Sequence, residues 1–326
     1  MADCPLCDGS PERRSGGDET HPRGSATCPG RRVGSVLAGK YRLDSLLGVG
    51  GMSAVYAAHH VILDREIALK VLHPSFARDR ELSVRFIREA RQTAAVGHPG
   101  FVNVHDAGTA EDGCAYIEMD RLSGCDLLTA AIDAGPFSAE RAASIAISVL
   151  DALAALHARG VVHRDLKTSN VFLMAGDDGD DRVDRVKLLD LGFARVASEP
   201  GLTAPKVMIG TPLYVSPEQC SDPTAVDARA DIFSLGIVLF EILTGLSPYH
   251  WKTRMQLMKK VLLGDLERHP RTERPDVPEW LDAIVARSLA HDREERFAGA
   301  AEMRAALEAR DVGLERPGLL RRLLGR

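Results

Sequence analysis

The residues with the clearest capacity for chemistry lie in one short segment, residues 163–170, near the middle of the chain. The segment combines the guanidinium of Arg164, the carboxylate of Asp165, the ammonium of Lys167 and the carboxamide of Asn170, and apolar runs flank it on both sides. These groups suit work on a polyphosphate, because a carboxylate accepts a proton and a cation neutralises phosphate charge. A surface turn would not explain this density of polar groups. The hypothesis is therefore that the rest of the chain positions this segment.

A lysine in an apolar strand is the next candidate. Residues 66–72 alternate as a β-strand does, which places Lys70 and Ala68 on one face. Because an isolated buried ammonium is very costly, a buried Lys70 requires an anionic partner. The alternative interpretation is an exposed lysine on an edge strand, and the position of Lys70 shortly after a glycine-rich run argues against it.

A helix predicted over residues 78–96 supplies that partner. Its apolar residues recur at every fourth position: Leu82, Phe86, Ala90 and Ala94. Glu89 lies beside this stripe, and it is predicted to reach inward to Lys70 and hold it extended. His98 and Pro99 are predicted to end the helix.

The glycine-rich run, residues 48–53, precedes the lysine strand. Glycines let a turn bring backbone N–H groups against phosphate oxygens with no side chain in the way. Alone, the run is a weak signal, because hairpin turns use glycine too. Ser53 stands where the third glycine of a G-x-G-x-x-G pattern would be. The run also lies between two strand-like segments, which argues against a dinucleotide-binding turn.

The elements around these residues change in kind along the chain. Strands are predicted first and long helices later, the strands at residues 41–47, 66–72, 101–107 and 114–119 and the helices at 139–158, 227–245, 253–263, 278–290 and 298–310. Two short strands, at 171–174 and 186–189, follow the polar segment. The change from strands to helices predicts a lobe boundary, with residues 120–124 as the hinge.

Composition is that of an ordinary globular protein, with 45% hydrophobic and 27% charged residues. A formal net charge of -5 gives no signal for nucleic acid binding, so no nucleic acid partner is expected. No apolar run reaches the ~18 residues that span a bilayer, and no charged start leads into an apolar stretch as in a signal peptide. Residues 309–326 form a basic tail, either frayed and solvated or in weak contact with a membrane surface. We therefore expect a cytoplasmic protein without a transmembrane segment.

The beginning of the chain differs from the rest. Residues 1–38 are rich in Gly, Pro, Ser, Arg and Asp, and they are expected to be flexible. Within them, Cys4, Cys7 and Cys28 resemble a degraded zinc ribbon, whose Zn²⁺ site His21 would complete. The alternative is a flexible tail that carries thiols.

A known family has these motifs in the same order. Over about residues 41–308 the chain resembles a eukaryotic-like serine/threonine protein kinase of the kind found in bacteria. The matching motifs are the glycine run, Ala68-Leu69-Lys70, Glu89, His163 to Asn170, Asp190-Leu191-Gly192, Ser216-Pro217-Glu218, Asp231 and Arg296. The resemblance implies a bilobal α+β fold with an ATP cleft between the lobes. A small, mainly antiparallel β-sheet lobe with one key helix would occupy residues 39–122, and a larger, mainly helical lobe would occupy residues 123–308.

The resemblance also implies a nucleotide site. The residues implied to bind ATP are Leu47, Gly48, Val49, Gly50, Gly51, Met52, Ser53, Val55, Ala68, Lys70, Met119, Asp120, Leu122, Asp126 and Asn170. Lys70, positioned by Glu89, would hold the α- and β-phosphates, and Asn170 and Asp190 would bind Mg²⁺ or Mn²⁺.

Catalysis would depend on Asp165 and Lys167. Asp165 would accept the proton of the substrate hydroxyl, and Lys167 would neutralise charge on the transferring phosphoryl group. A lysine two positions after the aspartate is what serine/threonine kinases have. The implied enzyme is therefore an ATP-dependent serine/threonine protein kinase with Ser and Thr hydroxyls of proteins as substrates.

Regulation and bracing are implied by further positions. Arg164 beside the catalytic aspartate suggests control by phosphorylation of the activation segment, with Thr203 as first acceptor and Ser198 as second. Thr211 would contact Asp165 and help to select a hydroxyl-bearing substrate. A transient homodimer would allow autophosphorylation. In the family, pairs such as Glu218 with Arg296 tie the end of the activation segment to the lower lobe, and aspartates at the position of Asp231 brace the catalytic loop.

Two other functions are weighed against this one. A nucleotide-binding pseudokinase or scaffold is disfavoured by intact catalytic positions: Lys70, Asp165, Asn170 and Asp190. A small-molecule kinase of the same fold is disfavoured by residues 216–218, which the resemblance makes part of a peptide platform. Three positions depart from the family pattern without losing a metal ligand, a lysine or a base: Ser53, Leu191 and Thr168.

Overall fold

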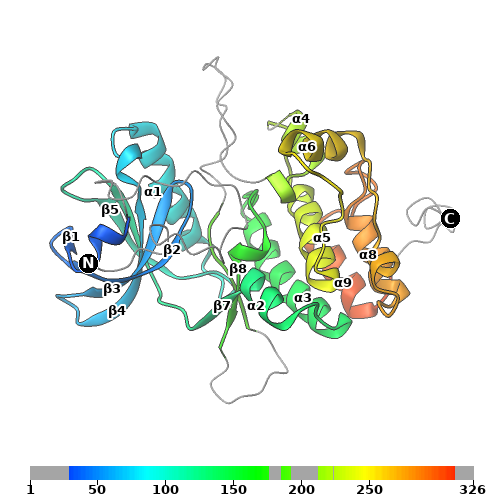
Figure 1. The fold of residues 1–326 in the computed structure, drawn as a ribbon, viewed down its shortest axis with the longest axis horizontal. Helices are drawn as coiled ribbons and strands as arrows, with labels where there is room; N and C mark the ends of the chain where they lie inside the picture. Colours follow the sequence, from blue (N-terminus) through cyan, green and yellow to red (C-terminus); the bar gives the residue numbers. More distant parts are fainter. Residues whose placement is uncertain (1–28, 176–184, 192–211, 223, 313–326) are drawn as a thin grey trace. The chain divides into compact units, whose positions relative to one another are not determined.

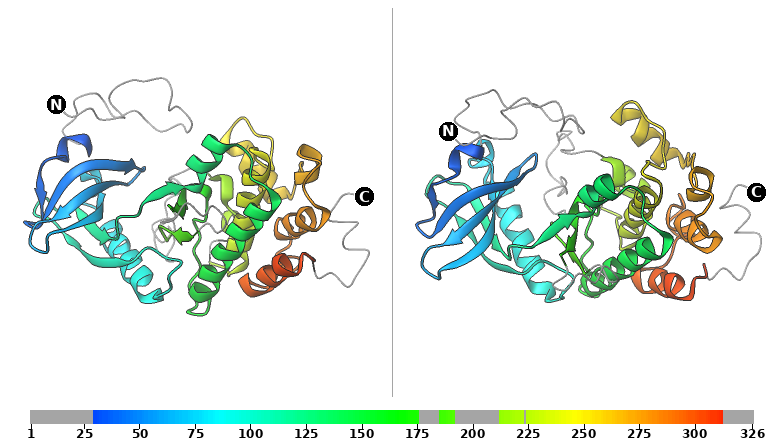
Figure 2. Two further views of the ribbon diagram at one scale, coloured as in Figure 1. Left: turned by 90° about the horizontal axis from the view of Figure 1, so that it is seen from below. Right: turned by 60° about the horizontal axis from the view of Figure 1, so that its bottom comes forward.

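The computed structural model describes residues 29–175, 185–191, 212–222 and 224–312. Within this part the chain divides into two compact units, drawn in Figures 1 and 2. The first contains residues 29–97 and 102–122, and the second contains residues 98–101 together with the described residues from 123 onward. No helix of the described part is long and apolar enough to cross a membrane.

An antiparallel sheet forms the first unit, with the strand order β1-β2-β3-β4-β6-β5 among its described residues. The strands are β1 (Val36–Leu37), β2 (Tyr41–Val49), β3 (Ser53–His60), β4 (Arg65–Leu72), β5 (Val104–Thr109) and β6 (Ala115–Met119), and two short 3-10 helices are η2 (Pro29–Arg32) and η3 (Pro74–Phe76). Figure 1 shows β2, β3 and β4 side by side in blue. The side chains of β4 are buried from Ile67 to Leu72, so both faces of this strand are covered.

The helix α1 (Arg80–Val96) packs on β5 and β6. Its N-terminus is capped by the side chain of Asp79, which accepts a hydrogen bond from the backbone of Leu82. It ends at Gly97, whose φ of 64° is the left-handed conformation that glycine adopts without steric cost. The predicted end of the helix at residue 96 is confirmed, and Gly97, just before His98 and Pro99, is the C-cap.

The buried face of α1 also differs from the predicted stripe. It consists of Phe86, Glu89, Ala90, Thr93 and Val96, while Ala94 is exposed. At 3.6 residues per turn, steps of four rotate steadily away from one face, so a buried stripe alternates steps of three and four. Glu89 consequently lies within the stripe and not beside it.

Helices dominate the second unit, where α5 packs against α3 and α8 and α3 packs against α9. Its helices are α2 (Leu127–Ala134), α3 (Ala139–His157), α4 (Pro217–Ser221), α5 (Arg229–Thr244), α6 (Arg254–Leu263), α7 (Pro270–Glu273), α8 (Glu279–Ser288) and α9 (Ala300–Ala309), with 3-10 helices η4 (Thr168–Asn170) and η6 (Pro212–Tyr214). A small antiparallel sheet joins β7 (Gly124–Asp126), β8 (Val171–Met174) and β9 (Val186–Leu188). Figure 2 shows α3 in green and α5 in yellow-green. Nearly every residue of α5 is buried, as in a core helix.

Some elements depart from the sequence-based expectations. Sequence patterns did not predict α2, and β5 begins at Val104 because Phe101 instead forms a parallel bridge with Leu188. Residues 29–38, expected within a flexible segment, form η2 and β1. Residues distant in the sequence hold this segment in place, since Tyr56 donates a hydrogen bond to the carbonyl of Pro29. Such a contact cannot be predicted from the amino-acid composition of the segment.

Candidate active site

Lys70 and Glu89 form a buried ion pair in the first unit. Lys70 lies on β4 and Glu89 on α1, and the Nζ atom of Lys70 is 3.1 Å from Oε1 of Glu89. Their side chains are only 8% and 6% exposed. The Nζ atom also lies 5.4 Å from the ring centre of Phe86, a favourable distance for a cation–π contact. Glu89 thus supplies the anionic partner that a buried Lys70 requires.

The register of the sheet gathers several predicted nucleotide residues on the face of Lys70. Val55 lies directly opposite Lys70, and Met119 lies directly opposite Ala68. Opposed residues of antiparallel strands share a face, and so do residues two apart on one strand. Val55, Ala68 and Met119 are thus apolar neighbours of the lysine side chain.

The glycine-rich run forms the tight turn between β2 and β3. Gly50 donates its backbone N–H to the carbonyl of Ser53 at 2.8 Å, which closes the turn around Gly51 and Met52. His73, just after β4, is a residue that sequence reasoning missed. Its backbone N–H donates to the carbonyl of Met52, and its Nε2 lies 2.8 Å from the carbonyl oxygen of Gly50. His73 therefore holds the tip of the turn from two sides.

The remaining predicted nucleotide residues have varied surroundings. Leu47 is exposed, whereas Val49 and Leu122 are half-buried. Asp120 accepts hydrogen bonds from Asn103 and His105. Asp126, implied to bond the ribose, caps α2 in the second unit by accepting from the backbone and the hydroxyl of Thr129.

The polar segment of the second unit converges on one carboxylate. Lys167 donates from Nζ to Oδ2 of Asp165 at 3.1 Å, and Asn170 donates from Nδ2 to the same oxygen at 3.2 Å and to the backbone carbonyl of Asp165 at 2.8 Å. The side chain of Asp165 is 13% exposed. The loop thus presents a carboxylate beside an ammonium, the arrangement expected of a proton acceptor close to a charge-neutralising group.

Asp231, at the start of α5, holds the beginning of this loop. Its carboxylate is fully buried and accepts hydrogen bonds from the backbone N–H groups of His163 and Arg164, at 2.8 and 2.9 Å. The ring of His157 lies 2.8 Å from the same carboxylate. Arg164 has a φ of 65°, which is strained for a residue with a side chain. The bracing expected of Asp231 is confirmed.

His163 lies under the loop and is fully buried. Burial lowers its pKa, although the charges of Asp231, Asp165 and Asp190 act in the opposite direction. A histidine that stays neutral fits a packing and hydrogen-bonding role.

Asp190 and Asn170 are brought together by β8 and β9. The backbone N–H of Leu189 donates to the carbonyl of Asn170 at 2.9 Å, so Asp190 follows directly after the paired residue. Both hydrogen bonds of the Asn170 side chain use the amide nitrogen. Its carbonyl oxygen and the carboxylate of Asp190 are oxygen donors of the kind that Mg²⁺ prefers, so these two residues fit the metal.

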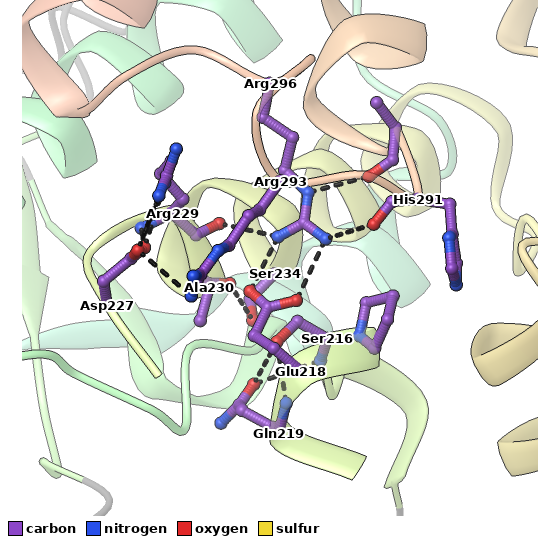
Figure 3. A network of polar contacts seen from close by, with 12 residues as sticks. Ser216, Glu218, Gln219, Asp227, Arg229, Ala230, Ser234, His291, Arg293 and Arg296 are labelled. Carbon is purple, nitrogen blue, oxygen red and sulfur yellow. Dashed lines mark hydrogen bonds and ion pairs between the residues drawn. The ribbon is translucent and has the colours of Figure 1, made fainter. Parts of the chain in front are cut away.

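Glu218 and Arg296 form the ion pair that the sequence predicted (Figure 3). Arg296 uses all the donors of its guanidinium: two reach Glu218, and the others reach the backbone carbonyls of Ala290, Arg229 and His291. Its side chain is fully buried over the ring of Phe233. This network fixes the short helix α4.

Several predicted residues lie outside the described part of the chain. These are the phosphorylation candidates Thr203, Ser198 and Thr211 and the zinc candidates Cys4, Cys7, His21 and Cys28. Among the described residues no cluster of three or more His, Cys, Asp or Glu could hold a metal ion. Of the cysteines that are described, Cys114 is buried, and burial raises the pKa of Cys220 to about 11.

Sequence reasoning also missed three side chains that contact or support the catalytic loop. Gln219 donates from its amide to the backbone carbonyl of Arg164 at 3.0 Å. Tyr214 lies 2.9 Å from the hydroxyl of Thr168 and donates to Glu241. Only Gln219 had a sequence signal, since a glutamine three residues after Ser216 fits a capping box.

Comparison with known proteins places this geometry in a family. The protein kinase domain family matches residues 41–308. Serine/threonine-protein kinase PknB of Mycolicibacterium smegmatis is 38% identical over 276 residues, which are 83% of this chain and 43% of that protein. Serine/threonine-protein kinase pkn3 of Myxococcus xanthus is 34% identical over 285 residues, which are 86% of this chain and 51% of that protein. The chain thus spans about half or less of these curated relatives.

The fold also resembles solved structures of protein kinase domains. The crystal structure of the Mycobacterium tuberculosis PknI kinase domain matches with a TM-score of 0.65 and 30% identity, and the match covers 85% of this chain and 98% of that one. The antiparallel sheet of the first unit and the helices of the second are the two lobes that the motifs predicted. The chain belongs to the protein kinase domain family.

Proposed function

We propose that this chain transfers the γ-phosphoryl group of ATP to serine and threonine hydroxyls of protein substrates. The observation that carries the proposal is the convergence of Lys167 and Asn170 on the carboxylate of Asp165. Asp165 accepts the proton of the attacking hydroxyl, and Lys167 offsets the negative charge that spreads over the transferring group. Both groups are held in place before the reaction, which is the condition for effective electrostatic stabilisation.

The ion pair of the first unit serves the nucleotide. Lys70, held by Glu89, binds the α- and β-phosphates of ATP, and the backbone N–H groups of the turn at residues 48–53 cover the phosphates. Val55, Ala68 and Met119 make apolar contact with the adenine ring, because they lie on the same face of the sheet as Lys70. These roles rest on the register of the sheet and on the family.

Asn170 and Asp190 hold the metal ion, Mg²⁺ or Mn²⁺. When bound, the metal neutralises phosphate charge. The contribution of the protein is to orient the two oxygen donors. Asn170 does so through its bonds to Asp165, which fix the amide plane.

The choice of substrate follows from the loop and from the relatives. Lys167 two positions after Asp165 is the serine/threonine pattern, and the relatives PknB and pkn3 are named serine/threonine-protein kinases. A rigid platform at residues 216–218, held by Arg296, suits an extended peptide. Four further parts of the proposal are drawn from the sequence. They are action in cytoplasmic signalling, a transient homodimer, weak membrane contact by the C-terminal tail, and Zn²⁺ binding at the N-terminus.

Transfer of radiolabelled phosphate from ATP to a generic basic protein tests the function. The wild type is expected to transfer label with Mg²⁺ or Mn²⁺, and Asp165→Asn to lose at least ~10²-fold, the usual contribution of a general base. Lys70→Met is expected to be inactive. Asp151→Asn removes an exposed carboxylate on α3 and serves as the control that keeps activity. Absence of transfer by the wild type with either metal would instead favour the nucleotide-binding scaffold.

Regulation by phosphorylation is a separate part of the proposal. Arg164 stands beside the catalytic aspartate, where a guanidinium can pair with a phosphate on the activation segment. Phosphosites are mapped on the wild type and on Asp165→Asn, each expressed alone. Thr203, followed by Ser198, is expected to be occupied only in the wild type. Equal occupancy in both proteins would exclude autophosphorylation.

A further inference from the structure

Thr168 lies inside the catalytic loop, between Lys167 and Asn170, and its side chain contacts none of the groups discussed so far as reacting. It is only 2% exposed. It begins the 3-10 turn η4, whose last residue is Asn170. Lys167 is the N-cap of this turn, and both Lys167 and Asn170 donate to the carboxylate of Asp165.

A hydrogen-bonded chain leads from Thr168 to α5. The hydroxyl oxygen of Thr168 is 2.9 Å from the hydroxyl of Tyr214, and Tyr214 donates to Oε2 of Glu241. An ionised Glu241 only accepts, so in that state Tyr214 gives its proton to Glu241 and its oxygen is left to accept from Thr168. With Glu241 ionised, Thr168 is the donor at the start of the chain.

Tyr214 is held independently of Thr168. Its backbone carbonyl accepts a 2.7 Å hydrogen bond from the hydroxyl of Ser234, and Ser234 and Glu241 both belong to α5. Tyr214 is thus bonded to α5 through both its backbone carbonyl and its phenol hydroxyl. The catalytic loop, through Thr168, therefore bonds to a hydroxyl whose position α5 fixes.

The same helix holds the catalytic loop at its other end. Asp231 of α5 accepts from the backbone of His163 and Arg164. Asp231 and Glu241 are separated by about 15 Å along the helix at 1.5 Å per residue. Asp165 and Lys167 lie between the two points of attachment.

We propose that Thr168 is a positioning residue that, through Tyr214 and Glu241, sets the orientation of the turn that carries Lys167 and Asn170. The proposal rests on the transfer reaction of Asp165 proposed above. The proposal adds a link between two segments. The catalytic turn η4 and the turn η6, which ends at Tyr214 just before the substrate platform, are both bonded to Glu241 of α5, Tyr214 directly and Thr168 through Tyr214. Removal of the hydroxyl should misalign the reacting groups without weakening the binding of ATP.

The test compares three variants with the wild type in steady-state transfer. Thr168→Val keeps the shape and removes the donor. It is expected to lower kcat about 5- to 10-fold, the effect of one hydrogen bond, while the KM for ATP changes less than twofold. Thr168→Ser restores the donor and should stay within twofold of the wild type. Ser288→Ala removes a fully buried hydroxyl that bonds only within α8, and it should leave kcat unchanged.

A double-mutant cycle identifies the partner. Tyr214→Phe removes the bond to Thr168 together with the bond to Glu241, so it should lower kcat at least as much as Thr168→Val does. The double variant should be no slower than Tyr214→Phe alone, since the Thr168–Tyr214 bond is then already lost. If Thr168→Val does not fold, Tyr214→Phe alone decides. An unchanged kcat in an active enzyme, or two effects that multiply, would overturn the inference.

Amide hydrogen exchange separates this inference from the proposed function. Residues 163–170 of Thr168→Val are expected to exchange faster than those of the wild type, whether or not either protein transfers phosphate. An inactive wild type with this difference would contradict the proposed function and keep the positioning role. Identical exchange in the two proteins would contradict the positioning role.

Discussion

Arg296 and Glu218 meet in a two-pronged ion pair, with Nη1–Oε1 and Nη2–Oε2 distances of 2.8 and 3.0 Å. The two residues are far apart in the sequence, and the pair joins α4 to the segment between α8 and α9 (Figure 3). The arginine is fully buried and the glutamate is 12% exposed. Loss of one partner would therefore leave a charge with little water around it.

Arg296→Met tests the strength of this pair. The variant is expected to lose ~3–5 kcal/mol of unfolding free energy, because an uncompensated charge remains buried. Urea denaturation measures the loss. Arg304→Met, which breaks an exposed pair with Asp151, is the control and should lose less than ~1 kcal/mol. A similar small loss in both variants would show that the buried pair contributes little.

His73 is expected to affect the binding of ATP more than its turnover. Its ring holds the carbonyl of Gly50 at the tip of the glycine-rich turn. His73→Leu should raise the KM for ATP about 5- to 10-fold, because one hydrogen bond that preorganises the loop is lost. His73→Gln can still donate and should lose less. Steady-state kinetics decide the point, and an unchanged KM in His73→Leu would remove this role from the histidine.

Asn170→Ala is expected to raise the Mg²⁺ concentration needed for half-maximal transfer. The change removes a proposed metal ligand together with its two hydrogen bonds to Asp165. A shift of at least ~10-fold is expected, as for the loss of a group that orients a metal site. Titration of Mg²⁺ at saturating ATP measures it, and EDTA should abolish transfer in both proteins. A fall in activity that no concentration of Mg²⁺ changes would place Asn170 outside the metal site.

Glu241 gives the stability a pH dependence with a definite sign. Burial raises the pKa of Glu241 from 4.5 to about 7, although the hydrogen bond from Tyr214 acts in the opposite direction. Between these two values the folded state binds more protons than the unfolded state, so stability falls as the pH rises. The loss is about 3 kcal/mol, since one pKa unit corresponds to ~1.4 kcal/mol.

Glu241→Gln removes this titration and keeps an oxygen for Tyr214. Urea denaturation of both proteins at pH 4.5 and pH 8 isolates the contribution, because other titrations cancel in the difference. The variant should gain about 3 kcal/mol relative to the wild type between the two pH values. A difference that does not change with pH would mean that Glu241 ionises as freely in the folded protein as in the unfolded chain.

The sequence by itself determined the family and the central chemistry. Asp165, Lys167 and Asn170 are close along the chain, so their spacing alone places them in one loop. The pairing of Lys70 with Glu89 was also predictable, because a lysine in an apolar strand requires a carboxylate and the following helix supplies one.

Tertiary structure alone decided how these groups are held. Thr168, Tyr214 and Glu241 come from three distant segments, and His73 meets Gly50 across a hairpin. No periodicity or local spacing connects such residues. The reacting groups of this protein lie in short segments of sequence. The side chains that orient those groups meet only when the chain folds, because a hydrogen bond depends on distance in space and not on distance along the chain.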